Sequence, residues 1–267
     1  MLTSYHAHSR WSDGDGEIEE FLAAARDLGL DEVGLSEHYV LSPDGRPVNW
    51  SMPLDALNAY LQAYAAAQER AEGDLLGRRG LEVDFFPETK AAVEEALAGK
   101  PLDYVIGSVH FLDGFPIDEN RRNWQVLTQD ERNTVIKGYW TRISQMAESG
   151  LFDVVGHLDL TKKFGFLPTV DIHAEVSAAL DAIARADMAV EINTAGWYAV
   201  CHEVYPEPGI IRACFERKIP VVVTADAHTP AHLTRGFDRA YALLQEIGYR
   251  HVACFSERRR ISRPMEL

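Results

Sequence analysis

Histidine and carboxylate residues follow short apolar runs along the whole chain, and this recurrence limits the fold more than any other feature. Six of the ten histidines take part. The candidate residues are His6, His8, Asp13, His38, Glu82, His110, His157, Asp226 and His228. Neutral imidazoles and carboxylates are good ligands for borderline divalent cations, and nine of them exceed what one tetrahedral ion uses. The pattern therefore predicts a centre of two or three metal ions, built from residues far apart in the sequence.

The apolar runs alternate with longer segments in which apolar residues recur at helical spacing. After a short strand-like start, strands are predicted at residues 31–36, 75–83, 104–109, 152–156, 188–192, 221–224 and 252–255. Helices are predicted at residues 17–28, 54–71, 134–148, 172–186 and 233–247. This alternation is typical of parallel α/β folds. Because no internal repeat, low-complexity tract or linker is found, residues 1–267 are predicted to form a single domain.

Most candidate ligands lie at or just after the carboxyl end of a predicted strand. In a (β/α) barrel these ends share one face, where the connecting loops build the active site. A doubly wound sheet would alternate strands and helices too, but it usually carries a glycine-rich phosphate loop, which is missing here. We therefore predict an α/β barrel of seven or eight strands. Two long segments, residues 39–53 and 112–128, are expected to cover the substrate on that face.

Composition narrows the class of partner. The formal net charge is −15, from 41 acidic and 26 basic residues, which argues against a general binder of nucleic-acid backbones. An anionic substrate is compatible with this charge only where bound cations offset it locally. The three cysteines are widely spaced and form no C-x-x-C pair, which indicates neither a disulfide framework nor a thiolate metal site. No apolar run is long enough to span a membrane. A cytoplasmic protein without membrane or nucleic-acid partners is therefore expected.

Two pairs of candidates have the spacing of ligands on one strand. Residues two apart in an extended strand point to the same side, so His6 with His8, and Asp226 with His228, can each present two ligands to one cavity. A single pair of this kind is weak evidence in a chain with ten histidines. The recurrence of histidines and carboxylates at other strand ends makes the metal interpretation the stronger one.

These motifs resemble the polymerase and histidinol phosphatase (PHP) family of metal-dependent phosphoesterases over nearly the full chain. The resemblance implies a distorted (β/α)7 TIM-like barrel with three divalent ions (Zn, Fe or Mn). It groups the ligands as His6, His8, Glu82 and Asp226 on one ion, Glu82, His110 and His157 on a second, and Asp13, His38 and His228 on a third. Asp13 stands where some relatives have histidine, which affects the metal preference of the third site.

Within that family the chain is most similar to the histidinol-phosphate phosphatases. The segments that carry this similarity are residues 156–164, 191–194, 205–206, 226–228 and 235–237. The implied reaction is hydrolysis of L-histidinol phosphate, a small-molecule phosphate monoester, to L-histidinol and phosphate in histidine biosynthesis. A hydroxide bridging two metal ions would attack, and Glu82, Asp226 and His228 are the predicted catalytic residues.

Two other functions remain open on the sequence. One is a broader PHP phosphoesterase or exonuclease acting on nucleotides or nucleic-acid ends, which the same metal site would support. The other is a non-catalytic metal-binding domain, against which the intact ligand set argues. The sequence does not indicate the oligomeric state.

Other polar residues are expected to bind the substrate or to support the ligands. Lys162, ahead of Lys163 and Arg235, is predicted to meet the phosphate, and Asn193 is a second candidate for that role. Carboxylates next to ligands, Glu37 and Asp159, are expected to fix imidazole tautomers. The amine and imidazole of the substrate call for a carboxylate and flat apolar surfaces, for which the candidates are Glu203, Trp50, Trp124, Trp197 and Tyr198.

Overall fold

Seven parallel strands form the centre of the protein. The computed structural model describes residues 2–71 and 73–265. The strands, in spatial order, are β1 (Thr3–Ser4), β2 (Glu32–Tyr39), β3 (Leu76–Asp84), β4 (Tyr104–Ser108), β7 (Val154–Val155), β8 (Ala189–Asn193) and β9 (Val221–Thr224). Ala7 and Ala227, just beyond β1 and β9, form an isolated parallel bridge, and the His8 amide donates to the Ala227 carbonyl at 2.9 Å. The sheet is therefore a nearly closed barrel, which confirms the predicted fold class.

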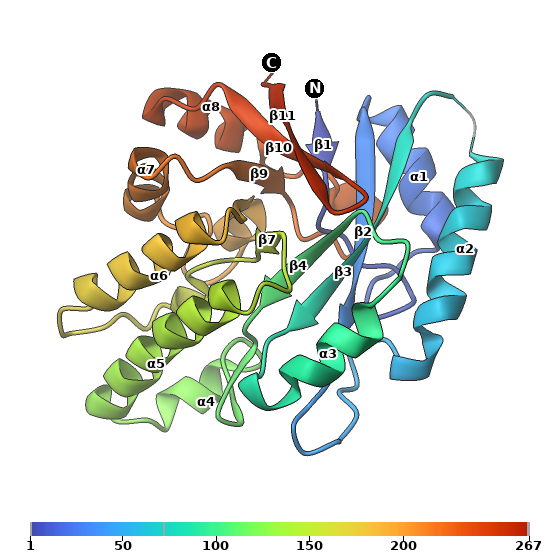
Figure 1. Cartoon of the computed structure of the whole chain (residues 1–267). Helices are drawn as coiled ribbons and strands as arrows, with labels where there is room; N and C mark the ends of the chain where they lie inside the picture. Colours follow the sequence, from blue (N-terminus) through green and yellow to red (C-terminus); the bar gives the residue numbers. More distant parts are fainter. Residues whose placement is uncertain (1, 72, 266–267) are drawn as a thin grey trace.

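Helices cover the outside of this barrel (Figure 1). They are α1 (Ile18–Asp27), α2 (Leu57–Arg70), α3 (Lys90–Leu97), α4 (Arg121–Gln125), α5 (Gln129–Glu148), α6 (His173–Arg185), α7 (Pro208–Glu216) and α8 (Phe237–Ile247). The five predicted helices are present, but α3, α4 and α7 were not predicted because they are short. Helix α5 begins five residues before the predicted start at residue 134, because Thr128 and Glu131 form a capping box at its amino-terminal end.

The last predicted strand is not part of the barrel. Residues 252–255 belong to β10 (His251–Ser256), which pairs with β11 (Arg259–Pro264) as an antiparallel hairpin. Phe255 from this hairpin packs its ring 6.1 Å from that of Tyr5 and 6.3 Å from that of Tyr104. The hairpin thus closes the amino-terminal end of the barrel, and the alternative of an eighth barrel strand is wrong.

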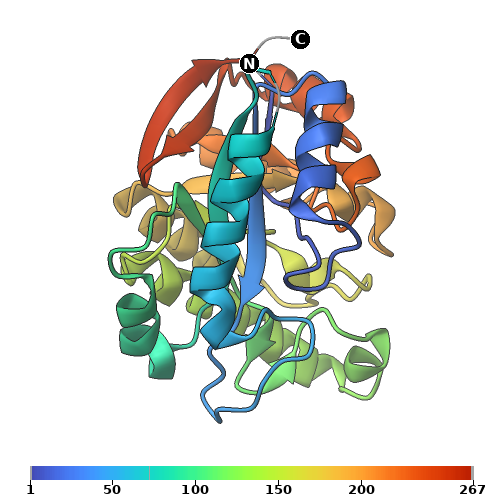
Figure 2. The same cartoon turned by 90° about the vertical axis from the view of Figure 1, so that its right-hand side faces the viewer.

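The opposite end of the barrel carries the two long segments. Residues 39–53 form a loop as predicted, whereas residues 112–128 contain helix α4 and most of a hairpin made by β5 (Phe111–Leu112) and β6 (Phe115–Pro116). Figures 1 and 2 show loop 39–53 and α4 at the end of the molecule that is farthest from both termini. No helix of the described residues is both long enough and apolar enough to cross a membrane.

Candidate metal centre

The structure brings all nine predicted ligands together at the carboxyl ends of the barrel strands. His38 and Glu82 lie on β2 and β3 and are paired across the two strands. The other seven follow the strand ends, where the chain turns into the loops. Most of these side chains are buried, including His6 and His8, which are inaccessible to solvent. The parallel register of the sheet is therefore what gathers ligands that are more than 200 residues apart in the sequence.

Glu82 stands at the centre of the group. Its Oε2 lies 2.8 Å from His38 Nδ1 and 3.1 Å from His6 Nε2. Its Oε1 lies 2.9 Å from His157 Nε2 and 3.6 Å from His110 Nε2. Burial would raise the pKa of this carboxyl, but the surrounding histidines, led by His6 and His38, hold the pKa well below its usual range. Glu82 is thus an ionised carboxylate whose two oxygens face two different sets of imidazoles.

Asp226 completes the set on one side of Glu82. Its Oδ1 lies 3.3 Å from His8 Nε2 and 3.5 Å from His6 Nε2. The backbone of Asp226 has φ +50°, in the left-handed region that aspartate tolerates better than most residues. This strained conformation aims the carboxylate back at the two histidines, and strain of this kind is common at functional sites.

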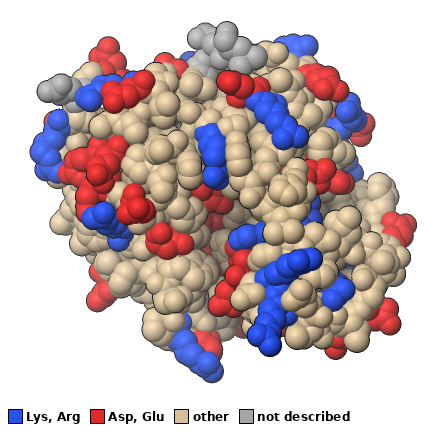
Figure 3. Space-filling view, turned by 180° about the vertical axis from the view of Figure 1, so that it is seen from behind, with Lys and Arg blue, Asp and Glu red and all other residues tan. Residues whose placement is uncertain are grey.

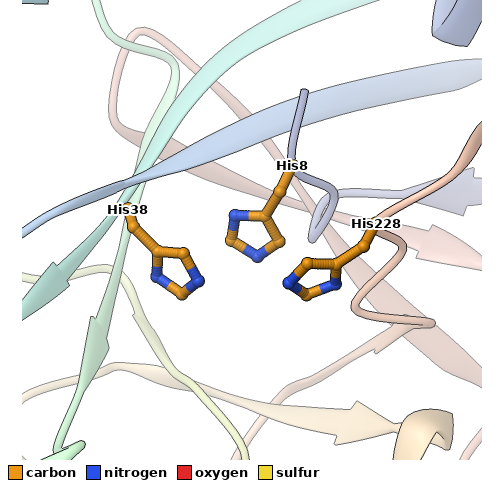
Figure 4. A group of neighbouring side chains, drawn as sticks. All are labelled: His8, His38 and His228. Carbon is orange, nitrogen blue, oxygen red and sulfur yellow. The ribbon is translucent and has the colours of Figure 1, made fainter. Parts of the chain in front are cut away.

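A second set lies at the outer edge of the cluster. Asp13 approaches His38 Nε2 at 3.6 Å and His228 Nε2 at 3.4 Å through its two carboxylate oxygens. The rings of His8 and His38 are stacked with their centroids 4.1 Å apart, and those of His8 and His228 are 4.6 Å apart. Figure 4 shows His8, His38 and His228 pointing toward one another from three separate segments.

Several buried atoms of the cluster have no hydrogen-bond partner, although ligand atoms of opposite character lie close by. They are His6 Nε2, both ring nitrogens of His8, His38 Nδ1, His157 Nδ1 and Glu82 Oε2. A buried polar atom without a partner costs free energy, so native proteins rarely leave a whole group of them. Divalent cations fit this donor set, because imidazole nitrogens and carboxylate oxygens of neighbouring residues lie close enough together to surround an ion.

The comparisons with known proteins agree with this geometry. The family model of the PHP domain matches residues 4–195. The chain belongs to the PHP domain family. It is 38% identical over 239 residues to a Deinococcus radiodurans protein named "Probable histidinol-phosphatase", which covers 89% of this chain and 90% of that protein. The resemblance predicted from the motifs is thereby confirmed.

Two further relatives extend the comparison. The histidinol-phosphatase of Bacillus subtilis is 28% identical over 79% of this chain and 87% of its own length. The crystal structure of histidinol phosphate phosphatase from Lactococcus lactis, complexed with zinc, L-histidinol and phosphate, superposes with a TM-score of 0.82 over 97% of this chain and 98% of that one. At 20% identity this last likeness shows that the barrels share a fold.

A second layer of carboxylates orients the ligands of the PHP domain. Glu191 on β8 is inaccessible to solvent and lies 2.5 Å from His6 Nδ1, while it also accepts from the His157 amide at 2.6 Å. Asp84 accepts from the His110 amide at 2.8 Å and lies 2.9 Å from its Nδ1. These contacts leave the Nε2 atoms of His6 and His110 facing Glu82. Fixing the tautomer in this way is a common role of carboxylates behind metal ligands.

Glu37 and Asp159 do not have the tautomer-fixing role that we predicted from their positions in the sequence. Glu37 accepts from the Ser9 amide and hydroxyl and from the Ser12 hydroxyl, so it holds the turn that leads to Asp13. Asp159 lies 2.8 Å from the Lys162 ammonium instead of an imidazole. Adjacency to His38 was misleading for Glu37 because consecutive residues of strand β2 point to opposite sides. Asp159 lies beyond β7, at the start of a 3₁₀ turn, where strand alternation does not apply.

Replacing Glu191 by glutamine should weaken metal binding in the PHP domain by about 10- to 100-fold, the usual cost of losing a carboxylate behind a ligand. The amide keeps the volume but removes the charge that orients His6 and the acceptor that holds the segment of His157. Metal affinity should be measured by competition with a chromophoric chelator. Glu95→Gln, on the exposed face of α3, is the matched control, and equal affinities of the two variants would contradict this role.

The residues predicted to contact the substrate do not all line the same cavity. Arg235 lines a cavity of about 470 Å³ above the cluster, together with Lys163, Asp118, Glu119 and Tyr198. Figure 3 shows the molecule from behind, where acidic and basic side chains both border a depression near the middle of the face. Lys163, which we ranked below Lys162, lies in this cavity with its ammonium 2.9 Å from Asp118. Sequence reasoning missed both acidic residues because they follow no strand of the barrel and lie within the long segment 112–128.

Lys162 and Asn193 are engaged elsewhere. The Lys162 ammonium contacts Asp159 at 2.8 Å, Glu203 at 2.9 Å and the Val204 carbonyl at 2.8 Å, and this side chain lines a groove on the outside of the barrel. Asn193 donates to Glu191 at 3.1 Å and to Asp226 at 3.2 Å. The geometry therefore gives Lys162 no free contact for a phosphate, and it makes Asn193 a support for Asp226.

Aromatic residues form one wall of the cavity. The ring of Trp50, from loop 39–53, lies 4.6 Å from that of His38 and 5.3 Å from that of His110, and it stacks on Phe111 at 6.0 Å. The predicted flat surface is therefore present at Trp50 and at Tyr198. Trp124, in contrast, is buried in the core with its indole nitrogen donating to the Ile117 carbonyl.

The metal-free protein should lose stability as the pH rises above about 6.5. Burial opposes the charge on His110, but Asp84 and Glu82 raise its pKa to about 10. Burial likewise opposes the charge on His228, while Asp13 leads the groups that raise its pKa to about 9. Both pKa values exceed the unfolded value of about 6.5, so this stabilisation is complete below that pH and is lost as the pH passes through 9 to 10.

The measurement is a series of calorimetric melting temperatures of the chelated protein between pH 6 and 10. The metal-loaded protein is the control, because ligation replaces the protons and removes this dependence. A melting temperature of the chelated protein that rose over this range would contradict the assignment.

Proposed function

We propose that this protein is a metal-dependent histidinol-phosphatase, which hydrolyses L-histidinol phosphate to L-histidinol and phosphate. The observation that carries the proposal is the cluster of nine ligand residues around Glu82, all but Asp13 buried or half-buried, below a cavity with cationic, acidic and aromatic walls. The relatives support the substrate, since the Deinococcus radiodurans and Bacillus subtilis proteins carry histidinol-phosphatase names.

Three ions, each Zn, Fe or Mn, would use the ligands as three groups. The first group is His6, His8, Glu82 and Asp226; the second is Glu82, His110 and His157; the third is Asp13, His38 and His228. Glu82 belongs to two groups because its two oxygens face different histidines. Bound divalent ions supply Lewis acidity toward phosphate oxygens and generate hydroxide from water near neutral pH. Zinc in the Lactococcus lactis crystal structure supports this choice of ions.

Arg235 is the proposed phosphate-binding cation. Its guanidinium lies 4.2 Å above the ring of Tyr198, and its buried Nε has no hydrogen-bond partner within the described chain. Stacking holds the planar group in place at the cavity wall and leaves its donors available for a planar, two-point contact with phosphate oxygens. Lys163 is the second cation of the cavity, but Asp118 already neutralises it.

The organic part of the substrate fits the remaining walls. The imidazole would lie against the flat surface of Trp50, Phe111 or Tyr198, and the ammonium would be drawn by Asp118 and Glu119. Because Lys163 pairs with Asp118, Glu119 is the acidic side chain that keeps an uncompensated charge for the ammonium. Expulsion of water by these walls would strengthen each polar contact with the bound ester.

Arg235→Gln is expected to raise KM for L-histidinol phosphate by about tenfold or more, because a charge-assisted hydrogen bond to the substrate is lost. The fold should be unaffected, since the side chain is half-exposed and does not line the core. Lys162→Met is the contrasting variant: it leaves Asp159 as an unpaired buried charge and should lower the melting temperature while KM stays near the wild-type value. The reverse pattern would assign the phosphate contact to Lys162.

The proposed reaction is tested by phosphate release from a panel of monoesters with the metal-loaded enzyme. L-Histidinol phosphate should give the highest kcat/KM, and glycerol phosphate, phosphotyrosine and a nucleoside monophosphate should be poorer substrates. Equal turnover of all four would remove the substrate proposal. Degradation of a short oligonucleotide at a comparable rate would favour the exonuclease alternative instead.

A further inference from the structure

We propose that a groove on the outer wall of the barrel, behind the metal centre, binds a small organic cation that joins an amine to an apolar body. This outer groove, of about 590 Å³, lies between helices α5, α6 and α7 and the chain from residue 159 to residue 173. Its walls are mainly apolar and include Trp140, Phe166, Val176, Leu180 and Ile210. The proposal is independent of the reaction proposed above.

A buried carboxylate oxygen without a partner points to the ligand. Asp159 lines the outer groove and is only 5% exposed. Its Oδ2 contacts the Lys162 ammonium at 2.8 Å and accepts from the Glu207 amide at 2.9 Å. Its Oδ1 has no hydrogen-bond partner among the described residues. A carboxylate oxygen left in this way lacks the donor that buried charged groups require, and an N–H group of a ligand in the groove would supply it.

The charges around the outer groove select a cation. The two long basic side chains of the lining are already occupied: Lys162 also contacts Glu203, and Arg217 donates to Asp181 and Ser177, each at 2.8 Å. Asp159 shares its one counter-ion with Glu203, so a net negative charge remains beside the free oxygen. An anion would find no unpaired lysine or arginine in this lining, whereas an ammonium would be attracted.

The outer groove adjoins the metal centre through one short segment of chain. Residues 157–163 separate the outer groove from the cavity above the metal cluster, which we call the mouth cavity. His157 and Lys163 line the mouth cavity, while Asp159 and Lys162 line the outer groove. Lys162 also ties this segment to the Val204 carbonyl, next to Tyr205 of the mouth cavity. A cation bound at Asp159 would compete for the carboxylate that holds Lys162, so occupancy of the groove is expected to change activity at the mouth.

The probe is phenethylamine, titrated into the metal-loaded full chain and followed by calorimetry, with 2-phenylethanol and 3-phenylpropanoate as neutral and anionic analogues of the same shape. The titrations are made in saturating inorganic phosphate, which fills the mouth cavity. Under these conditions we expect the amine to bind at least about tenfold more tightly than either analogue. Equal binding of the three probes, or loss of amine binding when phosphate fills the mouth, would overturn the proposal.

Two variants locate the site. Asp159→Asn should reduce affinity for phenethylamine to that of 2-phenylethanol. Because this change also removes one of the two carboxylates that pair with Lys162, Ala213→Phe is the second variant. It fills the groove from α7 without altering any charge, and it should abolish binding of the amine while leaving basal turnover unchanged. Retention of amine binding in Ala213→Phe would refute the site. The site would also be refuted if light scattering showed a dimer that dissociates on Leu167→Arg, because a second copy of the chain would then cover the groove.

Discussion

Removal of metal by a strong chelator is expected to abolish phosphate release and to lower the melting temperature by roughly 8–16 °C. An ion present at about 1,000 times its dissociation constant stabilises the folded state by about 4 kcal/mol. In a protein of this size each kcal/mol corresponds to about 2–4 °C. The expected shift therefore reflects a single tightly bound ion, and three ions would give a larger one.

The physical basis is the set of unpartnered atoms at the centre of the barrel. Both nitrogens of the His8 ring and one oxygen of Glu82 are buried without a hydrogen bond. In the metal-free protein these atoms have lost their water without gaining a partner, and the carboxylates can only be balanced by protonating neighbouring histidines. Burial and the charges of Glu191, Asp226 and Glu82 act in opposite directions on His6, and the carboxylates prevail and raise its pKa. Metal binding thus competes with protons.

The measurement combines elemental analysis, calorimetry and phosphate release on the same sample before and after chelation. Reloading with Zn, Fe or Mn separately should restore both melting temperature and activity, and the ion count per chain distinguishes one, two or three sites. Activity that survives complete chelation would exclude the metal-dependent reaction. Restored stability without restored activity would show that the ions are structural.

Much of the metal centre was predictable because parallel strands impose a simple geometry. Once the runs ending near His38, Glu82 and His110 are taken as neighbouring strands, their carboxyl ends must meet on one face. Side-chain alternation then accounts for the pairs that are two residues apart. The barrel and the meeting of its ligands follow from local patterns that need no knowledge of the loops.

The supporting contacts depend on the loops and on which side of a strand a residue faces. Glu191 was overlooked because it lies two residues before the end of β8, inside an otherwise apolar run. Lys162 was favoured by its distance along the chain from His157, but a short 3₁₀ turn at Leu160–Lys162 carries its side chain to the outer wall. Such turns are set by tertiary hydrogen bonds, which hydrophobic periodicity does not report.

Glu82→Gln should reduce kcat/KM by at least about 100-fold and remove at least one bound ion per chain. A 100-fold loss is the upper end of what a residue behind a ligand costs, and Glu82 is itself the shared neighbour of five imidazoles. Glutamine keeps the shape and buries no extra volume, but it has no negative charge. Its single carbonyl oxygen can serve only one of the two groups that the carboxylate faces.

The predicted loss is specific to this position, so the comparison with other carboxylates is informative. Glu95→Gln makes the same chemical change on the surface of α3 and should leave ion content and kcat/KM unchanged. Glu191→Gln should lie between the two, because Glu191 orients His6 without belonging to either metal group. If Glu82→Gln kept its full ion content and its activity, the carboxylate would not join the two metal groups, and the catalytic assignment of the cluster would have to be abandoned.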